Sequence, residues 1–491
     1  MISIGFDDRV SIGLQYILDN LHASSPFGQE RVRKLRFYAP DEREELAREL
    51  DCTERAAKEA PALKALYEKI MLVLCQLKDI RGSLTRLSEG AVLDHVELFE
   101  LKGFLLRVEE LLPLFCRMNE TVRAEGIAFS DPTEALKVLD PEHTRSRGFY
   151  IPDGASERLS AIRAEKKRLE QAMYAAETNA EKDALKTERT RVCAEEEAEE
   201  RAIRKAMSLA LLPFVPAMLA DADAAGRLDF LIQKALFGAR CACVRPTITE
   251  TELMLSGMIN PELCDLLKEK GRAFVPVSIA ADRGATVITG ANMGGKSVAM
   301  KTVALNALLM QAGFLVCARE ARLPMFHCVK LLFDDAQSMQ SGLSGFGSEI
   351  VRFNEALKDA EGGYSLLLID ELARGTNPDE GAVIVQAVTR YLNGANAISI
   401  LATHYDGVAA EANAHYQIIG LRDVDPAAIK AELSAGEKDG VALIARHMNY
   451  GLYRVEGASD CPRDALNICR MLSLKPEILD RIERSYGTEK S

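Results

Sequence analysis

The chain has 491 residues, of which 48% are hydrophobic and 27% are charged, and its formal net charge is −12. A chain of this length exceeds a single typical hydrophobic core, so we expect two or more domains. The composition is that of an ordinary soluble protein, and although a nucleic-acid binder can be acidic overall, no general basic footprint supports that role.

The sequence pattern predicts no targeting segment. The first residues, Met1–Asp8, lack the basic start and apolar core of a secretory signal, and no run of about 18 apolar residues predicts a membrane span. The 11 cysteines are scattered, and the closest pair, Cys241 and Cys243, has the wrong spacing for a zinc knuckle or a redox pair. We therefore expect a cytoplasmic protein with no membrane partner and with buried or incidental free thiols.

Residues 1–245 are predicted to form a helical domain. Apolar residues recur there at three- and four-residue steps, as in Leu63, Leu66, Ile70, Leu74 and Leu77. Within this domain, residues 155–212 contain no glycine or proline and are rich in Glu, Lys, Arg and Ala. This composition predicts a long solvated helix or an antiparallel helical hairpin, with Ile162, Leu169 and Met173 on one face.

The charges of this long helical stretch are divided between its two halves. The run Glu195–Glu200 is strongly acidic and is expected to be a solvated face, because it would repel DNA phosphates. The cations available for DNA contacts are Lys166, Lys167 and Arg168 on the first half.

Residues 246–491 alternate between short strands and helices. Strands are expected near residues 285–289, 314–318, 365–370 and 398–403, and a pair of short helices is expected within 460–491. Such alternation predicts a mainly parallel sheet covered by helices, with ligands at the carboxyl ends of the strands.

A phosphate-binding loop is the most specific motif in the chain. Gly290–Ser297 fits the pattern G-x-x-x-x-G-K-[ST] and lies between a predicted strand and a predicted helix. This arrangement points backbone N–H groups and the positive helix end at phosphates. The expected nucleotide-binding residues of the loop are Gly290, Asn292, Met293, Gly294, Gly295, Lys296 and Ser297. Lys296 would neutralise the β- and γ-phosphates of ATP, and the Ser297 hydroxyl would bind Mg²⁺.

Two further strands end in polar residues. Asp370 ends an apolar strand, which suits a Mg²⁺ ligand, and Glu371 follows it as the candidate general base. His404 follows another strand and is predicted to contact the γ-phosphate and to sense its loss. The alternative for His404 alone is a hydrogen-bonded core histidine. Together the three patches predict ATP binding and Mg²⁺-dependent ATP hydrolysis.

At this point the sequence resembles a known family. Ile288–Ser297 is similar to the loop of the MutS family of DNA mismatch-repair ATPases. Asp370–Pro378 resembles the strand and dimer-interface loop that follow in that family, and Ala402–Tyr405 resembles its switch histidine segment. Asp335–Ser338 and Ser344–Phe346 are similar to its signature region. In the helical half, the weaker matches are Pro26–Gly28 and Leu228–Phe230 with Lys234 and Ala235.

The resemblance implies a fold and an assembly. The fold would be an α/β P-loop NTPase of ABC/MutS type (246–491), preceded by an all-α core and lever domain (1–245) with a clamp-like helical hairpin. Two ATPase domains would form composite sites in a homodimer, or in a heterodimer with a MutS-like paralogue. Ser344 would reach the γ-phosphate bound by the partner subunit, or would alternatively be a helix cap. Arg374–Thr376 would line the interface, and Phe274 would stack on adenine.

Two functions remain open from the sequence. The first is a MutS-like ATPase that couples ATP hydrolysis to DNA binding in mismatch repair or recombination. It would lack the mismatch-reading domain, for which residues 1–25 leave no room, and a nuclease module after the last helices. The alternative is a protein-remodelling ATPase, for example a reactivating factor for a cobalamin-dependent aminomutase. The acidic balance favours an enzyme partner, whereas the family resemblance favours DNA.

Overall fold

The chain divides into two compact units, each made from more than one stretch of sequence. A computed structural model describes residues 2–141, 145, 151–290, 295–333, 345–422, 424, 447–456, 469, 474–475 and 477–482. The sheet unit is made of Met1–Leu21, Leu35–Ala57 and Lys234–Ser491, and the helical unit of His22–Lys34 and Lys58–Gln233. A single cut after residue 245 therefore does not separate them, because two segments from the first 57 residues belong with the sheets.

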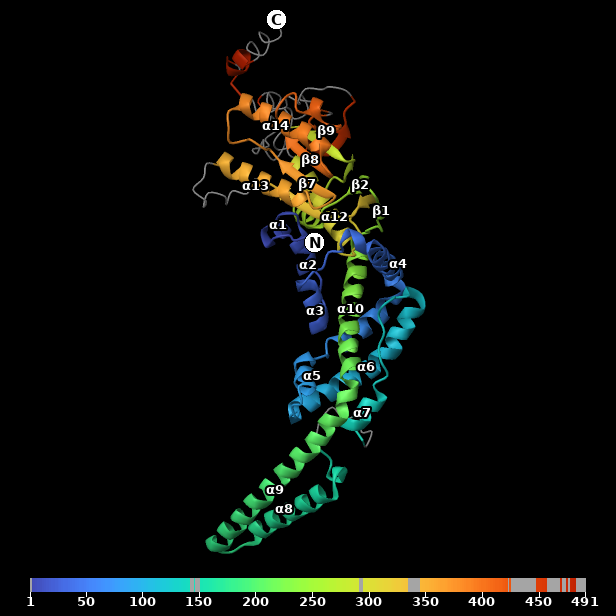
Figure 1. The fold of residues 1–491 in the computed structure, drawn as a ribbon, viewed down its shortest axis with the longest axis vertical. Coiled ribbons are helices and arrows are strands. Elements are labelled where there is room, and N and C mark those ends of the chain that lie inside the picture. The colour runs from blue at the N-terminus through green and yellow to red at the C-terminus, as the bar shows by residue number, and fades with distance from the viewer. Residues whose placement is uncertain are drawn as a thin grey trace. The chain divides into compact units, whose positions relative to one another are not determined.

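The helical unit confirms the helical periodicity of the first half of the sequence. Its elements, colour-graded from blue to green in Figure 1, are α3 (Pro26–Arg33), the later part of α4 (Arg43–Leu74), α5 (Arg81–Ser88), α6 (His95–Val122), α7 (Thr133–Leu139), η2 (Asp153–Ala155), α8 (Glu157–Ala175), α9 (Asn179–Leu211), η3 (Leu212–Phe214) and most of α10 (Val215–Arg240). The leucines and phenylalanines of α6 form much of its core, since Leu98, Leu101 and Phe104 are buried.

A buried carboxylate organises the beginning of this unit. Asp229 on α10 is fully buried and accepts hydrogen bonds from the Ser25 amide (2.6 Å), the Ser25 hydroxyl (2.7 Å) and the Ser24 amide (3.1 Å). The Ser25 hydroxyl oxygen in turn accepts from the Gly28 amide and caps α3. A Cβ atom at Gly28 would overlap the Asp229 carboxylate. The matches at Pro26–Gly28 and Leu228–Phe230 therefore belong to one packing site.

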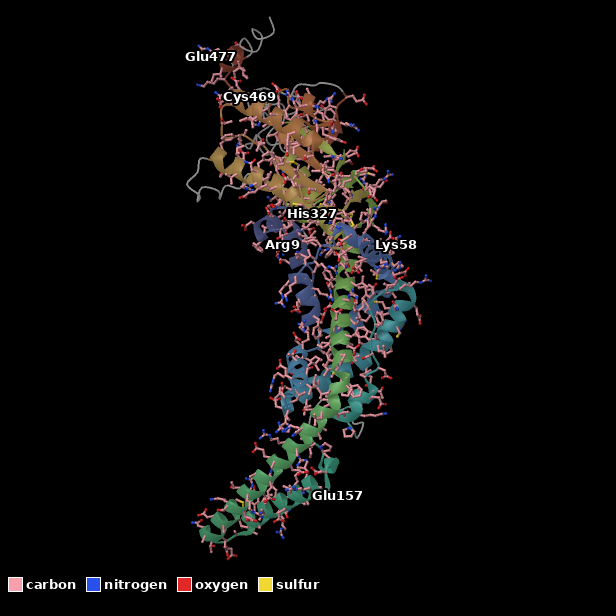
Figure 2. The ribbon with its side chains drawn as sticks, in the orientation of Figure 1. Arg9, Lys58, Glu157, His327, Cys469 and Glu477 are labelled. Atoms are coloured by element: carbon pink, nitrogen blue, oxygen red, sulfur yellow. The ribbon has the colours of Figure 1, made fainter. Side chains whose placement is uncertain are left out.

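Helices α8 and α9 pack against each other as a hairpin. Its apolar core consists of Ile162, Leu169 and Val192, with Leu185 packed against them. Both helices begin with a capping hydroxyl, Ser156 for α8 and Thr178 for α9. Most other side chains of the pair, from Glu157 at the beginning of α8 onward, project outward (Figure 2). The expected antiparallel helical hairpin is thus confirmed.

The sheet unit contains a six-stranded, mainly parallel sheet. The strand order is β10-β9-β4-β8-β7-β6, and only β10 runs antiparallel to its neighbour. Their bounds are β4 (Gly284–Thr289), β6 (Cys328–Leu332), β7 (Ser365–Asp370), β8 (Ala397–Thr403), β9 (Ala414–Gly420) and β10 (Asn449–Arg454). The predicted strands at 285–289, 365–370 and 398–403 are confirmed. The prediction at 314–318 is wrong, because this apolar segment makes only an isolated bridge at Val316 before the next strand begins.

Helices cover both faces of this sheet, which explains the continuous apolar runs of its strands. Helices α13 (Gly345–Ala360) and α14 (Pro378–Gly394) share one core with alternate residues of β7 and β8 (Figure 1). Helix α12 (Lys296–Gln311) contacts β7 and β8 and is almost entirely buried. At its end, the Gln311 side chain donates to Tyr38 O and Phe326 O and accepts from Phe326 N.

The remaining elements of the sheet unit form a second sheet and short helices. The second sheet has the order β1-β5-β2-β3, with β1 (Thr247–Thr249), β2 (Leu253–Met258), β3 (Val277–Ala281) and β5 (Glu320–Pro324). The helices are α1 (Phe6–Ser11), α2 (Leu14–Asp19), η1 (Pro40–Glu42), α11 (Pro261–Glu269) and η5 (Ala409–Glu411). Of the helices expected within 460–491, the described residues show helical structure at 477–482 and at 469.

One helical stretch differs from the expectation that nothing could span a membrane. By length and composition alone, Asn179–Arg240 passes as a candidate span, with a mean hydropathy of 1.4 in its most apolar window. The core helix of a soluble protein passes the same test. In this stretch 22% of the most apolar window is buried, and α10 supplies buried residues such as Leu228 and Ile232 to the helical unit.

Candidate functional site

Strand register brings the three sequence patches together at the carboxyl ends of the central strands of the large sheet. Strand β4 pairs with β8 so that Thr289 lies beside Thr403, and β7 pairs with β8 so that Asp370 lies beside Ala402. The Glu371 amide continues this pairing by donating to Ala402 O at 2.9 Å. Gly290, Glu371 and His404 therefore follow three neighbouring strands at their carboxyl ends, where ligands bind in sheets of this kind.

The phosphate-loop lysine is held at the beginning of α12. Lys296 is the first residue of that helix and is buried, and its ammonium donates to Gly290 O at 2.7 Å. The same ammonium lies 3.7 Å from Glu371 Oε1. Asn292, Met293 and Gly294, which are predicted nucleotide ligands, lie outside the described residues.

Glycine is required at both described ends of the loop. Gly290 has φ 143° and Gly295 has φ 89°, which are values that L-residues with a side chain rarely adopt. A Cβ atom on Gly295 would also lie 3.0 Å from the Tyr450 ring. The motif glycines thus serve backbone conformation and close approach, as the loop pattern implies.

Asp370 has an unsatisfied oxygen at the end of β7. Its carboxylate interacts with the Ser297 hydroxyl, but Oδ1 is buried and has no hydrogen-bond partner among the described residues. Burial raises the pKa of Asp370, and the hydrogen bond from Ser297 opposes that shift. Carboxylate and hydroxyl oxygens are ligands that Mg²⁺ accepts. The pair Ser297 and Asp370 therefore fits a Mg²⁺ ion.

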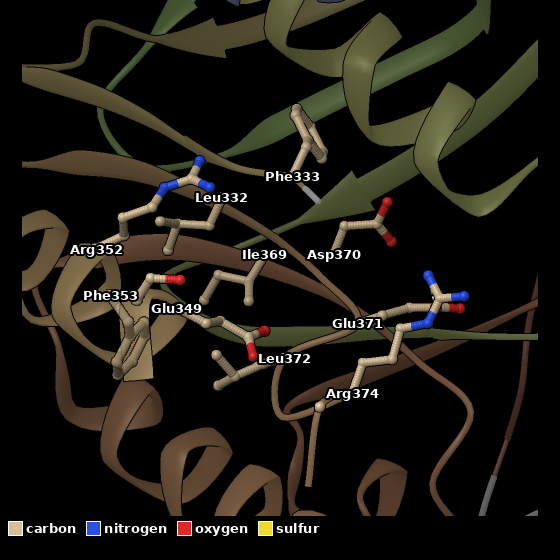
Figure 3. A pocket seen from close by; sticks show the side chains of 12 residues that line it. Leu332, Phe333, Glu349, Arg352, Phe353, Ile369, Asp370, Glu371, Leu372 and Arg374 are labelled. Carbon is tan, nitrogen blue, oxygen red and sulfur yellow. Dashed lines mark ion pairs between the residues drawn. The ribbon is translucent and has the colours of Figure 1, made fainter. Parts of the chain in front are cut away.

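Glu371 is the charged centre of the site. Its carboxylate lies 3.7 Å from the Lys296 ammonium, 3.6 Å from the Arg374 guanidinium and 4.0 Å from His404 Nδ1. Figure 3 shows the Arg374 side chain alongside this carboxylate. The residue also has φ 51°, a left-handed conformation that is uncommon outside glycine. Such strain is characteristic of functional positions and turns the chain sharply after β7.

Glu349 and Tyr405 support the segment after Glu371 through hydrogen bonds to Ala373. Sequence reasoning assigned a role to neither of them. Ala373 also has a positive φ of 66°. Its amide donates to Glu349 Oε1 at 3.1 Å, and its carbonyl accepts from the Tyr405 hydroxyl at 2.8 Å. Tyr405 directly follows His404, so the loops after β7 and β8 are tied together. A tyrosine within a strand-end motif was the only signal that could have pointed to it.

A cavity of about 320 Å³ opens beside the carboxylates. Asp370, Glu371 and Arg374 line it from the end of β7, and Glu349 and Arg352 line it from α13 (Figure 3). This cavity carries two cations and three carboxylates, so its walls are polar on both sides.

A second cavity, of about 670 Å³, extends from the other side of the phosphate loop. Gly295 and Ser297 form one end of it, and Phe274 lies in its apolar wall. Met448 and Tyr450 also line this wall, and sequence reasoning missed both. They lie about 150 residues after the loop, so only the pairing of β10 at the edge of the sheet brings them there.

The structure gives different outcomes for the predicted partner-contacting Ser344 and for the predicted DNA-contacting cations. Ser344 lies outside the described residues. The expected DNA-contacting cations of the hairpin lie on α8, but two of the three are engaged. Lys166 forms a 2.5 Å ion pair with Glu196, and Arg168 forms a 2.6 Å pair with Glu165.

The acidic run on α9 faces the cations of α8. Arg163 pairs with Glu196 at 3.1 Å and with Glu200 at 2.8 Å, in addition to Asp153 at 2.5 Å. Burial raises the pKa of Glu196, but hydrogen bonds from Lys166 and Arg163 outweigh burial and lower it below its usual value. The expectation of a simply solvated acidic face is therefore wrong for Glu196 and Glu200, which hold the hairpin together.

Comparisons with known proteins agree with this geometry. Residues 286–467 match the model of MutS domain V. The chain is 34% identical to Endonuclease MutS2 of Acetivibrio thermocellus over 199 residues, which is 40% of this chain and 25% of that protein. It is 29% identical to DNA mismatch repair protein MutS of Shouchella clausii over 322 residues, or 65% and 34% of the two chains.

A third relative matches across more of the chain. DNA mismatch repair protein MutS of Natronomonas pharaonis is 28% identical over 427 residues, covering 81% of this chain and 46% of that protein. The chain thus spans less than half the length of each of these three relatives. The family model covers β4, α12, β7 and β8, which carry the site. Residues 286–467 therefore match MutS domain V, and over the aligned parts the chain is similar to proteins named MutS2 and MutS.

Proposed function

We propose that this protein binds ATP with Mg²⁺ and hydrolyses it at the edge of the six-stranded sheet. The observation that supports this most directly is the convergence of Lys296, Ser297, Asp370 and Glu371 within one site, with an unpartnered buried oxygen on Asp370 among the described residues. Lys296 binds the β- and γ-phosphates, Ser297 and Asp370 hold Mg²⁺, and Glu371 positions and deprotonates the attacking water. Bound Mg²⁺ would neutralise negative charge that develops on the phosphates.

The contacts of Glu371 suggest how binding and chemistry are linked. Its carboxylate lies near Lys296, Arg374 and His404, but each of these distances exceeds that of a normal hydrogen bond. Phosphates of a bound nucleotide attract the Lys296 ammonium, which leaves Glu371 free to accept a proton from water. His404, whose side chain is 40% exposed, is able to turn toward the γ-phosphate.

The cavity beyond the loop is proposed to hold the nucleoside. Phe274 and Tyr450 supply aromatic surfaces for the adenine ring, and Met448 adds a polarisable contact. The chain contains no tryptophan, so its own fluorescence interferes little with that of a fluorescent ADP analogue. Tyr450→Ala is expected to weaken binding of this analogue, whereas Tyr174→Ala, at an exposed site on α8, leaves it unchanged.

ATP hydrolysis itself is tested by phosphate release from the purified protein. We expect turnover that requires Mg²⁺ and is lost when the metal is chelated. Nucleotide binding measured by calorimetry in the same samples separates a failure of binding from a failure of chemistry. Absence of both ATP binding and phosphate release would overturn the proposal.

Dimerisation follows from the same family relationship. We propose that Ser344 and Arg374–Thr376 face a second subunit, which is either another copy of this chain or a MutS-like paralogue. Arg374 is 59% exposed in the described structure, so its side chain is accessible to a partner. Light scattering of the Glu371→Gln variant is expected to show a doubled mass with ATP. A strictly monomeric, fully active enzyme would exclude a composite site.

DNA is the proposed macromolecular partner, in mismatch repair or recombination. The support is similarity to relatives that are named as an endonuclease and as DNA mismatch repair proteins. The alternative, a motor for an aminomutase or another enzyme, finds no support in those names. A salt titration tests DNA directly, because the log–log slope of affinity is about −0.9 per phosphate contacted. We expect equal affinity for paired and mismatched duplex, and no binding even at low salt would refute DNA as the partner.

A further inference from the structure

The end of α10 fixes two cysteines through a specific helix-capping motif. The Cys243 amide donates to Gly238 O at 2.9 Å, and the Ala242 amide donates to Ala239 O at 3.4 Å. Ala242 has φ 49°, so this is a Schellman motif with alanine at the left-handed position that glycine usually occupies. The motif sets Cys241 at the C-cap and Cys243 two residues beyond it.

A third cysteine lies directly opposite Cys243, although it is 74 residues away in the sequence. Val244 and Val316 exchange both backbone hydrogen bonds, each at 2.9 Å, in an isolated antiparallel bridge. Cys243 and Cys317 are therefore the next pair along, without mutual backbone bonds, where Cα atoms are about 4.5 Å apart. That separation is within the range of a disulfide. Their sulfur atoms lie 3.3 Å apart.

The backbone on the Cys317 side is also held in place. The Cys317 amide donates to Asn306 Oδ1 on α12 at 2.7 Å, and its carbonyl accepts from the Ile259 amide at 2.8 Å. Cys317 is fully buried, whereas Cys241 and Cys243 are partly exposed. Both thiols are thus held close together on anchored backbone, and an oxidant has access from the Cys243 side.

We propose that Cys243 and Cys317 form a reversible disulfide, with Cys241 as the neighbouring thiol that takes part in exchange. The oxidant is a small-molecule disulfide. With a small-molecule disulfide RSSR, the RS–SR bond breaks, the Cys243–Cys317 bond forms, and the two thiol protons leave with two RSH molecules. A metal site is the less suitable reading, because the described residues contain no group of three or more Cys, His, Asp or Glu side chains that could hold a metal ion.

The thiols are expected to react slowly at neutral pH. A hydrogen bond with Cys243 and burial both raise the pKa of Cys241. The hydrogen bond with Cys241 lowers the pKa of Cys243, but the bond with Cys317 and burial outweigh it and raise that pKa well above its usual value. Because the thiolate is the attacking species, the rate of disulfide formation should increase as the pH rises from about 7 to about 9.

The bond would act on the loop that it closes. Residues 243–317 include the phosphate loop and the whole of α12, so the crosslink restricts the unfolded chain around this segment. It would also attach the end of α10 covalently to the segment that follows α12. We therefore expect the oxidised protein to have a higher melting temperature than the reduced protein, by several degrees.

The test is disulfide mapping by mass spectrometry of the full chain after treatment with oxidised glutathione. Free thiols are alkylated under denaturing conditions before digestion. We expect one crosslink between Cys243 and Cys317, reversed by dithiothreitol, and a melting temperature that rises with it. Cys243→Ser and Cys317→Ala should each abolish the crosslink and the rise, while Cys75→Ser, an exposed thiol on the helical unit, should abolish neither.

Two further variants identify the bonded sulfur on the α10 side. Cys241→Ser should retain the Cys243–Cys317 bond but form it more slowly, and Cys264→Ser should behave like the unmodified protein. If all thiols remain open to alkylation after oxidation at about pH 9, where a larger share of each thiol is ionised, the proposal is wrong. It is also wrong if Cys317 remains free, or bonds to a cysteine other than Cys243, while Cys243 is present. Since none of these measurements involves nucleotide, the result does not depend on the proposed ATPase function.

Discussion

The edge of the large sheet and the α8–α9 hairpin use charged residues in opposite ways. At the sheet edge, Glu371 has three charged or ionisable neighbours, none closer than 3.6 Å, and Asp370 Oδ1 has no hydrogen-bond partner among the described residues. In the hairpin, Lys166 and Glu196 meet at 2.5 Å. The carboxylates of the first region remain able to bind a ligand, whereas the charges of the second pair mostly with each other, although Arg204 Nε on α9 is also buried without a hydrogen-bond partner among the described residues.

This difference distinguishes charged residues that remain able to bind a ligand from charged residues that pair with each other to support the fold. Unsatisfied buried polar groups are costly, so their presence at a sheet edge calls for a ligand as compensation. Exposed ion pairs contribute little stability each, but several of them between two helices keep an otherwise thin hairpin in register. The hairpin in this chain is therefore better suited to a structural role than to gripping phosphates with α8.

The largest effect is expected from removing the base at the sheet edge. Glu371→Gln should reduce the turnover number for ATP by about 10²- to 10⁴-fold, because a general base contributes this much. Nucleotide affinity should persist, since Lys296 remains. Single-turnover phosphate release with parallel binding measurements checks this. Glu355→Gln, an exposed change on α13, is the matched control, and parental turnover in Glu371→Gln would contradict the assignment.

Removing the buried cation should affect binding rather than chemistry alone. Lys296→Ala is expected to weaken ATP binding by about 100-fold, because charge-assisted hydrogen bonds to the phosphates are lost. Calorimetry with ATP and Mg²⁺ measures the change. Lys358→Ala, at an exposed position on α13, should bind like the parent. Unchanged affinity in Lys296→Ala would mean that the ammonium faces another group.

In the helical unit, a steric change in the core should lower the free energy of unfolding more than a change of surface charge does. Gly28→Ala places a methyl group against the buried Asp229 carboxylate and should lower the free energy of unfolding by about 1–3 kcal/mol. Gly82→Ala, where a Cβ atom meets nothing within 4 Å, is the control. Urea titration followed by circular dichroism compares the two variants. Equal stability would show that the site relaxes more easily than its packing indicates.

The smallest expected effect concerns the hairpin ion pairs. Glu196→Gln should lower stability by at most about 1 kcal/mol, because the pairs are close to the surface. The folded pKa of Glu196 is lowered, so its contribution is fully present above the unfolded pKa and is lost as the pH falls through the folded pKa. Urea titrations should therefore show a difference in the free energy of unfolding between parent and variant at neutral pH. This difference should disappear at acidic pH.

The same variant also tests the contrast in charge use. Without the Glu196 charge, Lys166 becomes available to phosphates, while Arg163 keeps its pairs with Glu200 and Asp153, so DNA affinity and its salt dependence should increase. Glu188→Gln, whose partner Arg191 is on the same helix, removes an equal charge without releasing a cation of α8. Identical DNA binding by the two variants would show that only net charge matters.

Local patterns were sufficient to predict the parts of the site that are close in sequence. The strands that end before Gly290, at Asp370 and before His404 were predicted correctly, because a fully buried parallel strand gives a short apolar run. Phe274 was assigned to adenine stacking from the resemblance alone, and the structure places it in one cavity with Ser297.

The features that the sequence did not reveal depend on distant pairing. Tyr450 reaches the phosphate loop only because β10 pairs with β9 at the sheet edge. Glu196 meets Lys166 because the hairpin register places residues 30 apart side by side. The segment 314–318 is apolar without being a strand, because it is buried as a connection after α12. A pattern of hydrophobic residues reports burial and does not report hydrogen-bond partners.

Helix α12 also has a mechanical consequence. Its first residue, Lys296, carries the ammonium that is proposed to bind the phosphates, and its last residue, Gln311, accepts a hydrogen bond from the Tyr38 amide and donates one to the Tyr38 carbonyl. Sixteen helical residues span about 24 Å, and a helix enclosed by close packing moves as a stiff rod. We therefore expect an axial shift of α12 at Lys296 to move Gln311 and the Tyr38 backbone bonded to it, so that α12 couples the proposed nucleotide site to the chain that leads into α4.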